Sequence, residues 1–258
     1  MDCAGSTLIF SRLPLAEALL GLSRIGFSTV EVGAVEGWAH LSPVRAARDQ
    51  DAVLTELREG LAGAWISAIA INAGLRGTET EQREQALALC RIARAVGAGT
   101  LTIPAAAGPG IPPGEADRLR SLVGIAQGYG VKLAVECHMG TLAEDPATAA
   151  DLCHAVPGLG LTLDPSHFWA GRAQGKGWEV VLPYVRHVHL RDAGFGGWQE
   201  IQVAPGKGAV DFVGVRDALR SAGQHPTFAV EYIDTIPVGN GGSAEEAALA
   251  MRSLVAEL

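Results

Sequence analysis

Residues 132–136 read Lys-Leu-Ala-Val-Glu, a short run of mostly aliphatic side chains that ends in a carboxylate. A run of this length is typical of a β-strand. Because successive side chains of a strand point to opposite sides, Ala134 and Glu136 share one side while Leu133 and Val135 take the other. One side is therefore bulky and apolar, and the other is small and carries an ionisable group at its C-terminal end.

The same alternation occurs in two later runs. One side of each run is small or polar and ends in a carboxylate, and it consists of Gly160, Thr162 and Asp164 in the first run and of Thr227, Ala229 and Glu231 in the second. The opposite side holds bulky apolar residues, which are expected to face covering helices. The small or polar side is then expected to face the interior of a closed sheet.

Short runs of this kind alternate with longer stretches rich in Ala, Leu, Arg and Glu along the whole chain, which is the pattern of parallel β-α units. The predicted strands are 2–6, 29–32, 65–71, 100–104, 132–136, 159–164, 187–190 and 227–231. The predicted helices are 14–25, 51–62, 79–96, 115–129, 145–154, 178–184, 211–222 and 244–258. There is no linker-like tract, no G-x-G-x-x-G turn and no P-loop. Eight units of each kind predict an α/β fold, a single (β/α)8 TIM barrel over residues 1–258.

Composition narrows the class of protein. The 258 residues are 48% hydrophobic, with mean hydropathy +0.21, formal charge −8 and pI near 5.4. Without a Lys/Arg-rich block, this charge argues against nucleic acid or an anionic membrane as a partner and favours a small neutral or polar ligand. No run is long enough to span a bilayer and the N-terminus lacks a signal-peptide pattern, so a cytoplasmic protein is expected. The four cysteines lack C-x-x-C spacing and are expected to be reduced thiols.

Four of the runs carry an ionisable residue at their last or second-last position, namely Glu136, Asp164, His189 and Glu231. They are spaced by about one β-α unit each, so a closed barrel brings all four to the same rim. Any one of them could simply cap a helix, and it is the set of four that favours a metal. Three carboxylates and an imidazole repel one another unless a cation binds between them, and these donors suit Mn²⁺, Mg²⁺, Co²⁺ or Zn²⁺. We therefore expect one divalent metal ion, with Mn²⁺ as the first choice.

Several motifs together resemble those of the xylose-isomerase-like TIM barrels, the sugar phosphate isomerase/epimerase superfamily: GFSTVEV, LAVECHMGTL, LTLDPSHF, VRHVHLRD, PGKGAVDF and FAVEYI. The resemblance covers essentially the whole chain. In the epimerase branch, a Glu, an Asp, a His and a Glu at the ends of the last four strands bind the metal, and these match Glu136, Asp164, His189 and Glu231 by position. The resemblance also implies that Glu136 and Glu231 are the catalytic acid and base, moving a proton next to a carbonyl through a metal-stabilised enediolate.

Other polar residues near the predicted rim are expected to contact substrate. His138 shares the side of the strand that carries the ligand two residues earlier, and His167 and Arg191 each follow a ligand closely. Arg191 could instead pair with Asp192. Two deeper inward-facing residues are expected to support the site or the fold by hydrogen bonding or packing rather than to bind metal: Glu31 and His187.

The leading functional hypothesis is a metal-dependent isomerase or epimerase acting on a ketose, a hydroxy-ketone or a related polyol. No compact basic cluster marks a phosphate site, which favours an unphosphorylated substrate. The alternative is a metal-dependent lyase of the inosose or dehydroshikimate dehydratase type, which the motif ECHMGTL also resembles. A non-catalytic accessory barrel is a second alternative on fold alone. An endonuclease of the superfamily is disfavoured, because the early strands lack the extra histidines for its three zinc ions. Relatives are often oligomers, so a homodimer or homotetramer is a further expectation.

Overall fold

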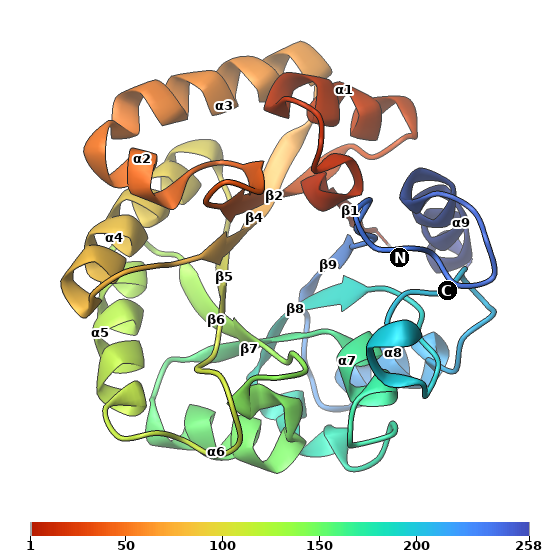
Figure 1. Ribbon diagram of the computed structural model, residues 1–258. Coiled ribbons are helices and arrows are strands. Elements are labelled where there is room, and N and C mark those ends of the chain that lie inside the picture. Colours follow the sequence, from red (N-terminus) through yellow and green to blue (C-terminus); the bar gives the residue numbers. More distant parts are fainter. Residues whose placement is uncertain (1, 258) are drawn as a thin grey trace.

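The computed structural model describes residues 2–257, and its strands close into a barrel surrounded by helices (Figure 1). The nine-stranded sheet has the order β1-β9-β8-β7-β6-β5-β4-β2-β3, and a further pairing of β1 with β2 closes it. The two-residue β3 (Ala39–His40) pairs antiparallel with the end of β2. The other eight strands are parallel and form the barrel, which confirms the predicted (β/α)8 fold.

The barrel strands are β1 (Ala4–Ser6), β2 (Thr29–Val35), β4 (Ser67–Gly74), β5 (Thr100–Pro104), β6 (Lys132–Glu136), β7 (Gly160–Leu163), β8 (Val185–Leu190) and β9 (Thr227–Val230). Strands β5 and β6 have the predicted bounds. Strands β7 and β9 each end one residue before the predicted position, so Asp164 and Glu231 lie just beyond their strands. Strand β4 runs three residues past its predicted end at Ile71.

The helices are α1 (Leu15–Arg24), α2 (Pro43–Arg48), α3 (Gln50–Ala64), α4 (Glu79–Val96), α5 (Glu115–Gly128), α6 (Pro146–Ala155), α7 (Pro165–Ala170), α8 (Phe212–Ser221) and α9 (Ala244–Ala256), with 3-10 turns η1 (Thr7–Phe10), η2 (Leu142–Glu144), η3 (Trp178–Tyr184) and η4 (Gly197–Gln199). The predicted helix 178–184 is a 3-10 segment with Pro183 inside it, which cannot donate a backbone hydrogen bond. Sequence analysis missed the six-residue helices α2 and α7. The predicted end of the last helix, Leu258, lies outside the described residues. Within residues 2–257, no helix is long and apolar enough to span a bilayer.

Helix α4 shows how the sequence sets these elements. The Thr78 hydroxyl accepts from the Glu81 backbone N–H while the Glu81 carboxylate accepts from the Thr78 backbone N–H, a capping box at the first turn. Ala86, Leu89 and Cys90 recur at helical spacing and are buried against the sheet side. The helix ends at Gly97, whose φ of 84° suits a residue without a Cβ.

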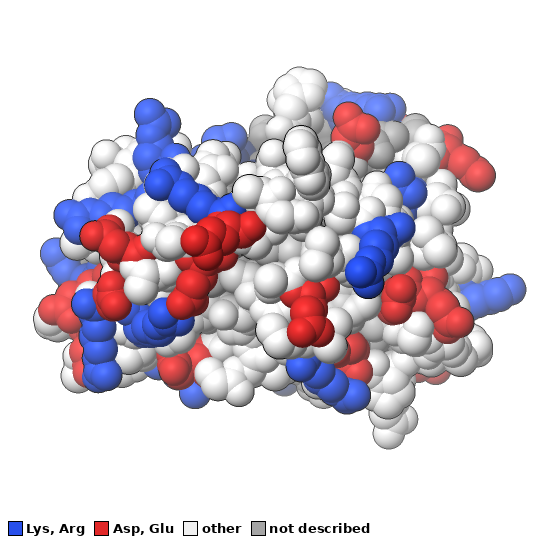
Figure 2. Space-filling view, turned by 90° about the horizontal axis from the view of Figure 1, so that it is seen from above, with Lys and Arg blue, Asp and Glu red and all other residues white. Residues whose placement is uncertain are grey.

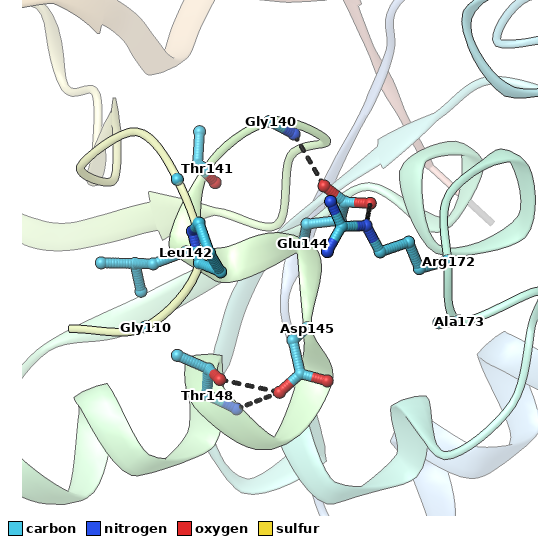
Figure 3. Close-up of a pocket in the computed structure, with 11 residues that line it drawn as sticks. Gly110, Gly140, Thr141, Leu142, Glu144, Asp145, Thr148, Arg172 and Ala173 are labelled. Carbon is cyan, nitrogen blue, oxygen red and sulfur yellow. Dashed lines mark hydrogen bonds and ion pairs between the residues drawn. The ribbon is translucent and has the colours of Figure 1, made fainter.

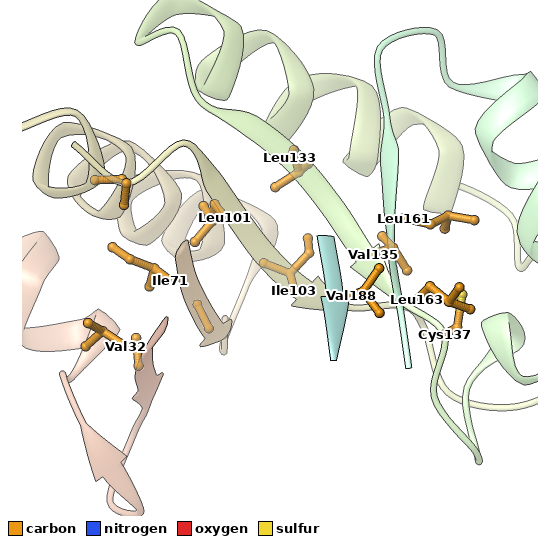
Figure 4. Close-up of a cluster of buried hydrophobic side chains, with 14 of the residues drawn as sticks. Val32, Ile71, Leu101, Ile103, Leu133, Val135, Cys137, Leu161, Leu163 and Val188 are labelled. Atoms are coloured by element: carbon orange, nitrogen blue, oxygen red, sulfur yellow. The ribbon is translucent and has the colours of Figure 1, made fainter. Parts of the chain in front are cut away.

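The main hydrophobic core lies between the sheet and the helices, where outward-pointing strand residues such as Leu133, Val135 and Leu161 gather (Figure 4). The opposite side of the same strands fills the barrel interior with small and polar groups. There the hydroxyl oxygens of Thr102 and Thr162, from β5 and β7, lie 2.7 Å apart. The predicted alternation, bulky toward the helices and polar toward the interior, therefore holds in the structure.

The four cysteines are free, as predicted. Burial raises the pKa of Cys90 to about 12 and holds the pKa of Cys137 well above its usual range. These thiols stay protonated and pack as small apolar groups.

Acidic and basic side chains are interspersed over the face of the molecule seen in Figure 2, without a continuous field of one sign. One example of such mixing is the exposed ion pair between Arg45 of α2 and Glu56 of α3. A surface pair of this kind contributes little to stability.

Candidate metal and proton-transfer site

The four ionisable residues at the ends of the last strands lie together at the C-terminal mouth of the barrel. One ligand atom from each of Glu136, Asp164, His189 and Glu231 lies within 4.8 Å of the others. All four side chains are buried. Glu136 is the last residue of β6 and His189 lies in β8, while the other two immediately follow β7 and β9. The structure thus brings together residues that are up to 95 positions apart in the chain, Glu136 and Glu231.

Asp164 is held in place by the start of helix α7. Its Oδ1 accepts hydrogen bonds from the backbone N–H of Ser166 at 2.9 Å and from the Ser166 hydroxyl at 2.6 Å. Pro165 at the first helical position needs no donor partner, which favours a turn at this point. The second oxygen, Oδ2, lies 2.5 Å from Nη2 of Arg191. Asp164 is therefore both a helix cap and a member of the buried cluster.

His189 presents one ring nitrogen to the carboxylate cluster and the other to the barrel interior. Its Nδ1 lies 3.3 Å from Oε1 of Glu136 and 3.5 Å from Oε2 of Glu231. Its Nε2 lies 3.1 Å from Oε2 of Glu31. A carboxylate on one nitrogen fixes the ring and leaves the other nitrogen directed at the place where a metal ion would bind.

Glu31 connects His189 to a second buried histidine. Glu31 Oε2 also lies 3.0 Å from Nε2 of His187, and His187 Nδ1 lies 2.6 Å from the Thr227 hydroxyl. Burial favours the neutral acid, but His189 and His187 outweigh it and hold the pKa of Glu31 well below its usual range. Glu31 Oε1 is buried without a hydrogen-bond partner. Both deeper residues lie beneath the four-residue cluster and contact it from below.

Sequence analysis missed one polar neighbour, Asn72 of β4. Its Nδ2 donates a hydrogen bond to Oε1 of Glu231 at 3.1 Å. Its position near the C-terminal end of β4, with the side chain facing the barrel interior, could have identified it. An amide donor here holds one oxygen of Glu231 and leaves the other, Oε2, toward His189.

The carboxylates and the imidazole perturb one another. Burial, together with the nearby Glu136 and Glu31 carboxylates, raises the pKa of Glu231 to about 8. Burial acts in the same direction on Glu136, but the hydrogen bond and charge of His189 outweigh it and lower the pKa of Glu136. Burial disfavours the His189 cation, yet Glu231 and Glu31 hold the pKa of His189 well above its usual range. The site is a region of excess negative charge that retains protons.

The residues fit a divalent cation. The donor set consists of three carboxylates and one imidazole whose ligand atoms are close enough to share one ion. Among residues 2–257, the carboxylates of the four-residue cluster and of Glu31 lie near one permanent cation, Arg191, so a doubly charged ion would reduce a net negative charge. The Glu31 contact to the far side of His189 supplies the support that metal-binding histidines commonly have.

His138, His167 and Arg191 all line the cavity above this cluster. The ring centroids of the two histidines are 3.9 Å apart, and Nε2 of His167 lies 3.0 Å from Nη2 of Arg191. Arg191 binds Asp164 and not its neighbour Asp192, so that alternative pairing is wrong. The Asp192 carboxylate instead accepts backbone N–H groups from the loop after β8, including those of Gly206 and Gly208.

The cavity has a volume of about 290 Å³ and two unlike sides. The polar side holds Asn72, Glu136, His138, His167, Arg191 and Glu231. The apolar side holds Leu8, Val35, Trp38, Trp198, Ile233 and Ile236. The two tryptophans come from the turn after β2 and the loop after β8.

A separate hollow of about 460 Å³ lies outside the rim, between the loops after β5, β6 and β7 (Figure 3). Its acidic side chains accept hydrogen bonds from residues of the same loop and the helix start that follows it. Glu144 accepts from the backbone N–H of Gly140, and Asp145 accepts from the backbone and hydroxyl of Thr148. These carboxylates shape the loop, and the chemistry-bearing groups face the central cavity.

A family model matches most of this chain. Residues 21–254 match the family model described as xylose isomerase-like TIM barrel. Among curated proteins, no sequence matches.

Three solved structures have the same fold. A xylose isomerase-like TIM barrel protein from Mycobacterium smegmatis in complex with magnesium has a TM-score of 0.79 at 17% identity, over 99% of this chain and 95% of that one. The probable 3-DHS dehydratase AsbF of Bacillus anthracis, involved in petrobactin synthesis, has a TM-score of 0.76 at 15% identity, over 99% of both chains. D-allulose 3-epimerase from Methylomonas sp. has a TM-score of 0.75 at 14% identity, over 100% of this chain and 97% of that one. At these identities the likeness establishes the fold.

Proposed function

Because the chain belongs to the xylose isomerase-like TIM barrel family, we propose that it is a divalent-metal-dependent isomerase or epimerase of an α-hydroxy carbonyl compound, namely a ketose, a hydroxy-ketone or a related polyol. The observation that carries the proposal is the convergence of Glu136, Asp164, His189 and Glu231 beneath a cavity of substrate size. Structural likeness to an epimerase and to a magnesium-bound barrel supports it.

In this proposal Glu136, Asp164, His189 and Glu231 hold the ion, with Mn²⁺ as the first choice. A bound divalent ion supplies Lewis acidity, which polarises a carbonyl and stabilises the charge that develops when the adjacent C–H is lost. Glu31 would hold the His189 ring with Nδ1 toward the Glu136 and Glu231 carboxylates, and Asn72 would keep one oxygen of Glu231 in place.

Glu136 and Glu231 are the proton-transfer residues in this proposal. They rise from β6 and from the end of β9, and both line the cavity. A substrate lying between them presents its acidic C–H to one carboxylate and the opposite face or the neighbouring carbon to the other. One carboxylate takes the proton while the other returns one, which inverts a centre or shifts a carbonyl.

His138, His167 and Arg191 contact substrate oxygens in this proposal. All three side chains line the same cavity as the two glutamates. Since Arg191 already binds Asp164 and Ser166, it offers its remaining N–H groups in a fixed direction.

A metal-dependent dehydratase is the second candidate, favoured by the structural likeness to a probable 3-DHS dehydratase. The first step would be the same proton removal. The outcome would differ because a β-hydroxyl would leave as water, and a conjugated product would absorb ultraviolet light. A non-catalytic barrel would neither exchange protons nor release water.

The test combines metal analysis with deuterium exchange. The purified protein, loaded with Mn²⁺, is incubated in D₂O with ketoses, simple hydroxy-ketones and cyclic polyol ketones, and the C–H signals are followed by NMR. We expect retention of one ion per chain and exchange that falls at least 100-fold in Glu136→Gln and Glu231→Gln. The matched control is Glu56→Gln, on the exposed surface of α3, which should exchange like the parent. Absence of bound metal, or unchanged exchange in Glu231→Gln, would refute the proposal.

A further inference from the structure

The apolar residues on one side of the central cavity pack against one another. Leu8 and Ile233 are buried and pack together with Val35 and Ile236 in one small cluster at the mouth. These residues come from η1, the end of β2 and the segment after β9. They lie near strand ends that are adjacent in the sheet, because β1 pairs with both β2 and β9.

Two tryptophans extend this apolar side outward. Trp38 is 40% exposed and Trp198 is 57% exposed, and both line the cavity. The Trp198 ring centroid lies 5.5 Å from that of His138, which places it at the border between the two sides. A ligand that extends from the glutamates toward the mouth would therefore pass from polar to apolar surroundings.

The apolar side chains offer few hydrogen-bond partners to a polyhydroxylated chain. An open-chain hexulose carries further hydroxyls beyond its reacting carbons, and a buried hydroxyl without a partner costs affinity. Of the six side chains named for this side, only the indole N–H groups of Trp38 and Trp198 can donate a hydrogen bond. Carbon-bound surface is what these walls can bury favourably.

A phosphorylated substrate is disfavoured by charge. Among the cavity-lining residues that the structure describes, Arg191 is the one Lys or Arg. Its Nη2 lies 2.5 Å from Asp164, and its Nη1 lies 3.8 Å from Glu231. A phosphate group would meet a guanidinium already balanced by carboxylates, with Glu136 nearby and no second Lys or Arg among the described lining residues.

We propose that the substrate is an uncharged α-hydroxy-ketone whose portion beyond the reacting carbons is apolar, held against Leu8, Val35, Ile233 and Ile236 with the tryptophans at the mouth. The reacting end of this assignment rests on the proposed function. The apolar end rests on the cavity walls alone, so the two parts can fail separately.

The test compares three uncharged compounds with the same reacting group, and D-fructose 6-phosphate as a charged fourth. Acetoin (3-hydroxybutan-2-one) has no distal portion, 3-hydroxyheptan-2-one adds three methylenes, and D-fructose carries hydroxyls instead. Deuterium exchange next to the carbonyl in the Mn²⁺-loaded protein gives kcat/KM, and quenching of tryptophan fluorescence gives binding without turnover. Each buried methylene is worth about fourfold, so 3-hydroxyheptan-2-one should exceed acetoin by at least tenfold in both measurements. D-fructose should not exceed acetoin, and D-fructose 6-phosphate should bind more weakly still.

A pair of matched variants locates the effect. Val35→Thr puts a hydroxyl into the apolar wall at nearly constant size, and it should lower the ratio of 3-hydroxyheptan-2-one to acetoin severalfold. Val213→Thr makes the same change on α8, where the side chain is 45% exposed and outside the cavity, and it should leave the ratio unchanged. Preferential binding of D-fructose or its phosphate, or an unchanged ratio in Val35→Thr, would overturn the inference. If acetoin and the others fail to exchange but bind in the expected order, the proposed function fails while the apolar assignment stands.

Discussion

Replacing Glu31 by glutamine tests whether the buried residues beneath the site prepare His189 for a metal ion. Glu31 Oε2 lies 3.1 Å from His189 Nε2 and 3.0 Å from His187 Nε2. Glutamine keeps the size and an acceptor oxygen but removes the charge, and charge-assisted hydrogen bonds are about twice as strong as neutral ones. The metal-facing nitrogen would then be held less firmly and would be less basic.

The expected magnitude follows from the position of Glu31. It contacts the ligand histidine through Oε2 and is not itself one of the four proposed ligands, so its loss should weaken metal binding without abolishing it. Partners of this kind typically change metal affinity by about 10- to 100-fold, which corresponds to about 1.4–2.8 kcal/mol. Direct loss of a ligand, as in His189→Ala, should cost more.

The assay is calorimetric titration of the metal-free protein with Mn²⁺ at pH 8, where protons compete less for His189 Nδ1 than at neutral pH, because the pKa of His189 is raised. Glu59→Gln is the matched control, because Glu59 is exposed on α3 and far from the cluster in the fold. Circular dichroism of the metal-free variants checks that each is folded. Equal Mn²⁺ affinity in Glu31→Gln and Glu59→Gln would show that the contact from Glu31 does not prepare His189 for a metal ion, and it would refute the supporting role assigned to Glu31.

Three further predictions follow from the same structure. Metal binding should release at least one proton per chain near pH 7, because the pKa of Glu231 is raised to about 8 and that of His189 is also raised. Calorimetry in buffers of different ionisation enthalpy measures the number of protons released, and a value of zero would contradict the prediction. In the metal-free protein, the raised pKa of Glu231 stabilises the folded state fully below the unfolded pKa near 4.5, and this contribution is lost as pH rises through about 8. The melting temperature of the metal-free protein should therefore fall between pH 6 and 9, and it should fall less steeply in Glu231→Gln. Adding Mn²⁺ at 100 times its Kd should raise the melting temperature by roughly 5 °C. Leu89→Ala, at a fully buried position of α4, should lower the free energy of unfolding by about 2–5 kcal/mol, whereas Leu249→Ala, 45% exposed on α9, should change it by less than about 1 kcal/mol; urea denaturation compares the two, and equal effects would contradict the assigned core.

Much of the fold could be predicted because its signals are local. The side-chain alternation in 132–136 and the caps of helices such as α4 depend on neighbouring residues, and both elements have their predicted bounds. The errors occur where tertiary contacts set the length of an element. Helix α7 has only six residues and is capped by Asp164, and its stretch 165–170 is too short to show helical periodicity.

The candidate site was predictable in part for the same reason. Strand ends of a parallel barrel meet at one rim, so the positions of Glu136, Asp164, His189 and Glu231 in the chain were sufficient to place them together. The contacts around them were not predictable in this way. Asn72 binds Glu231 across 159 positions and Glu31 lies against His189 across 158, and these partners depend on how far each strand is shifted along its neighbour.

The sequence by itself determined the barrel, the inward side of each strand and the identity of the four rim residues, because side-chain direction in a strand is a local property. Only the tertiary structure decided that Arg191 turns to Asp164, that Glu31 holds His189 from below, and that the cavity has a polar and an apolar side. The physical reason is that these contacts join elements brought together by closure of the sheet. Register and loop paths decide which side chains come within hydrogen-bonding distance there, and neither is encoded in any single stretch of the chain.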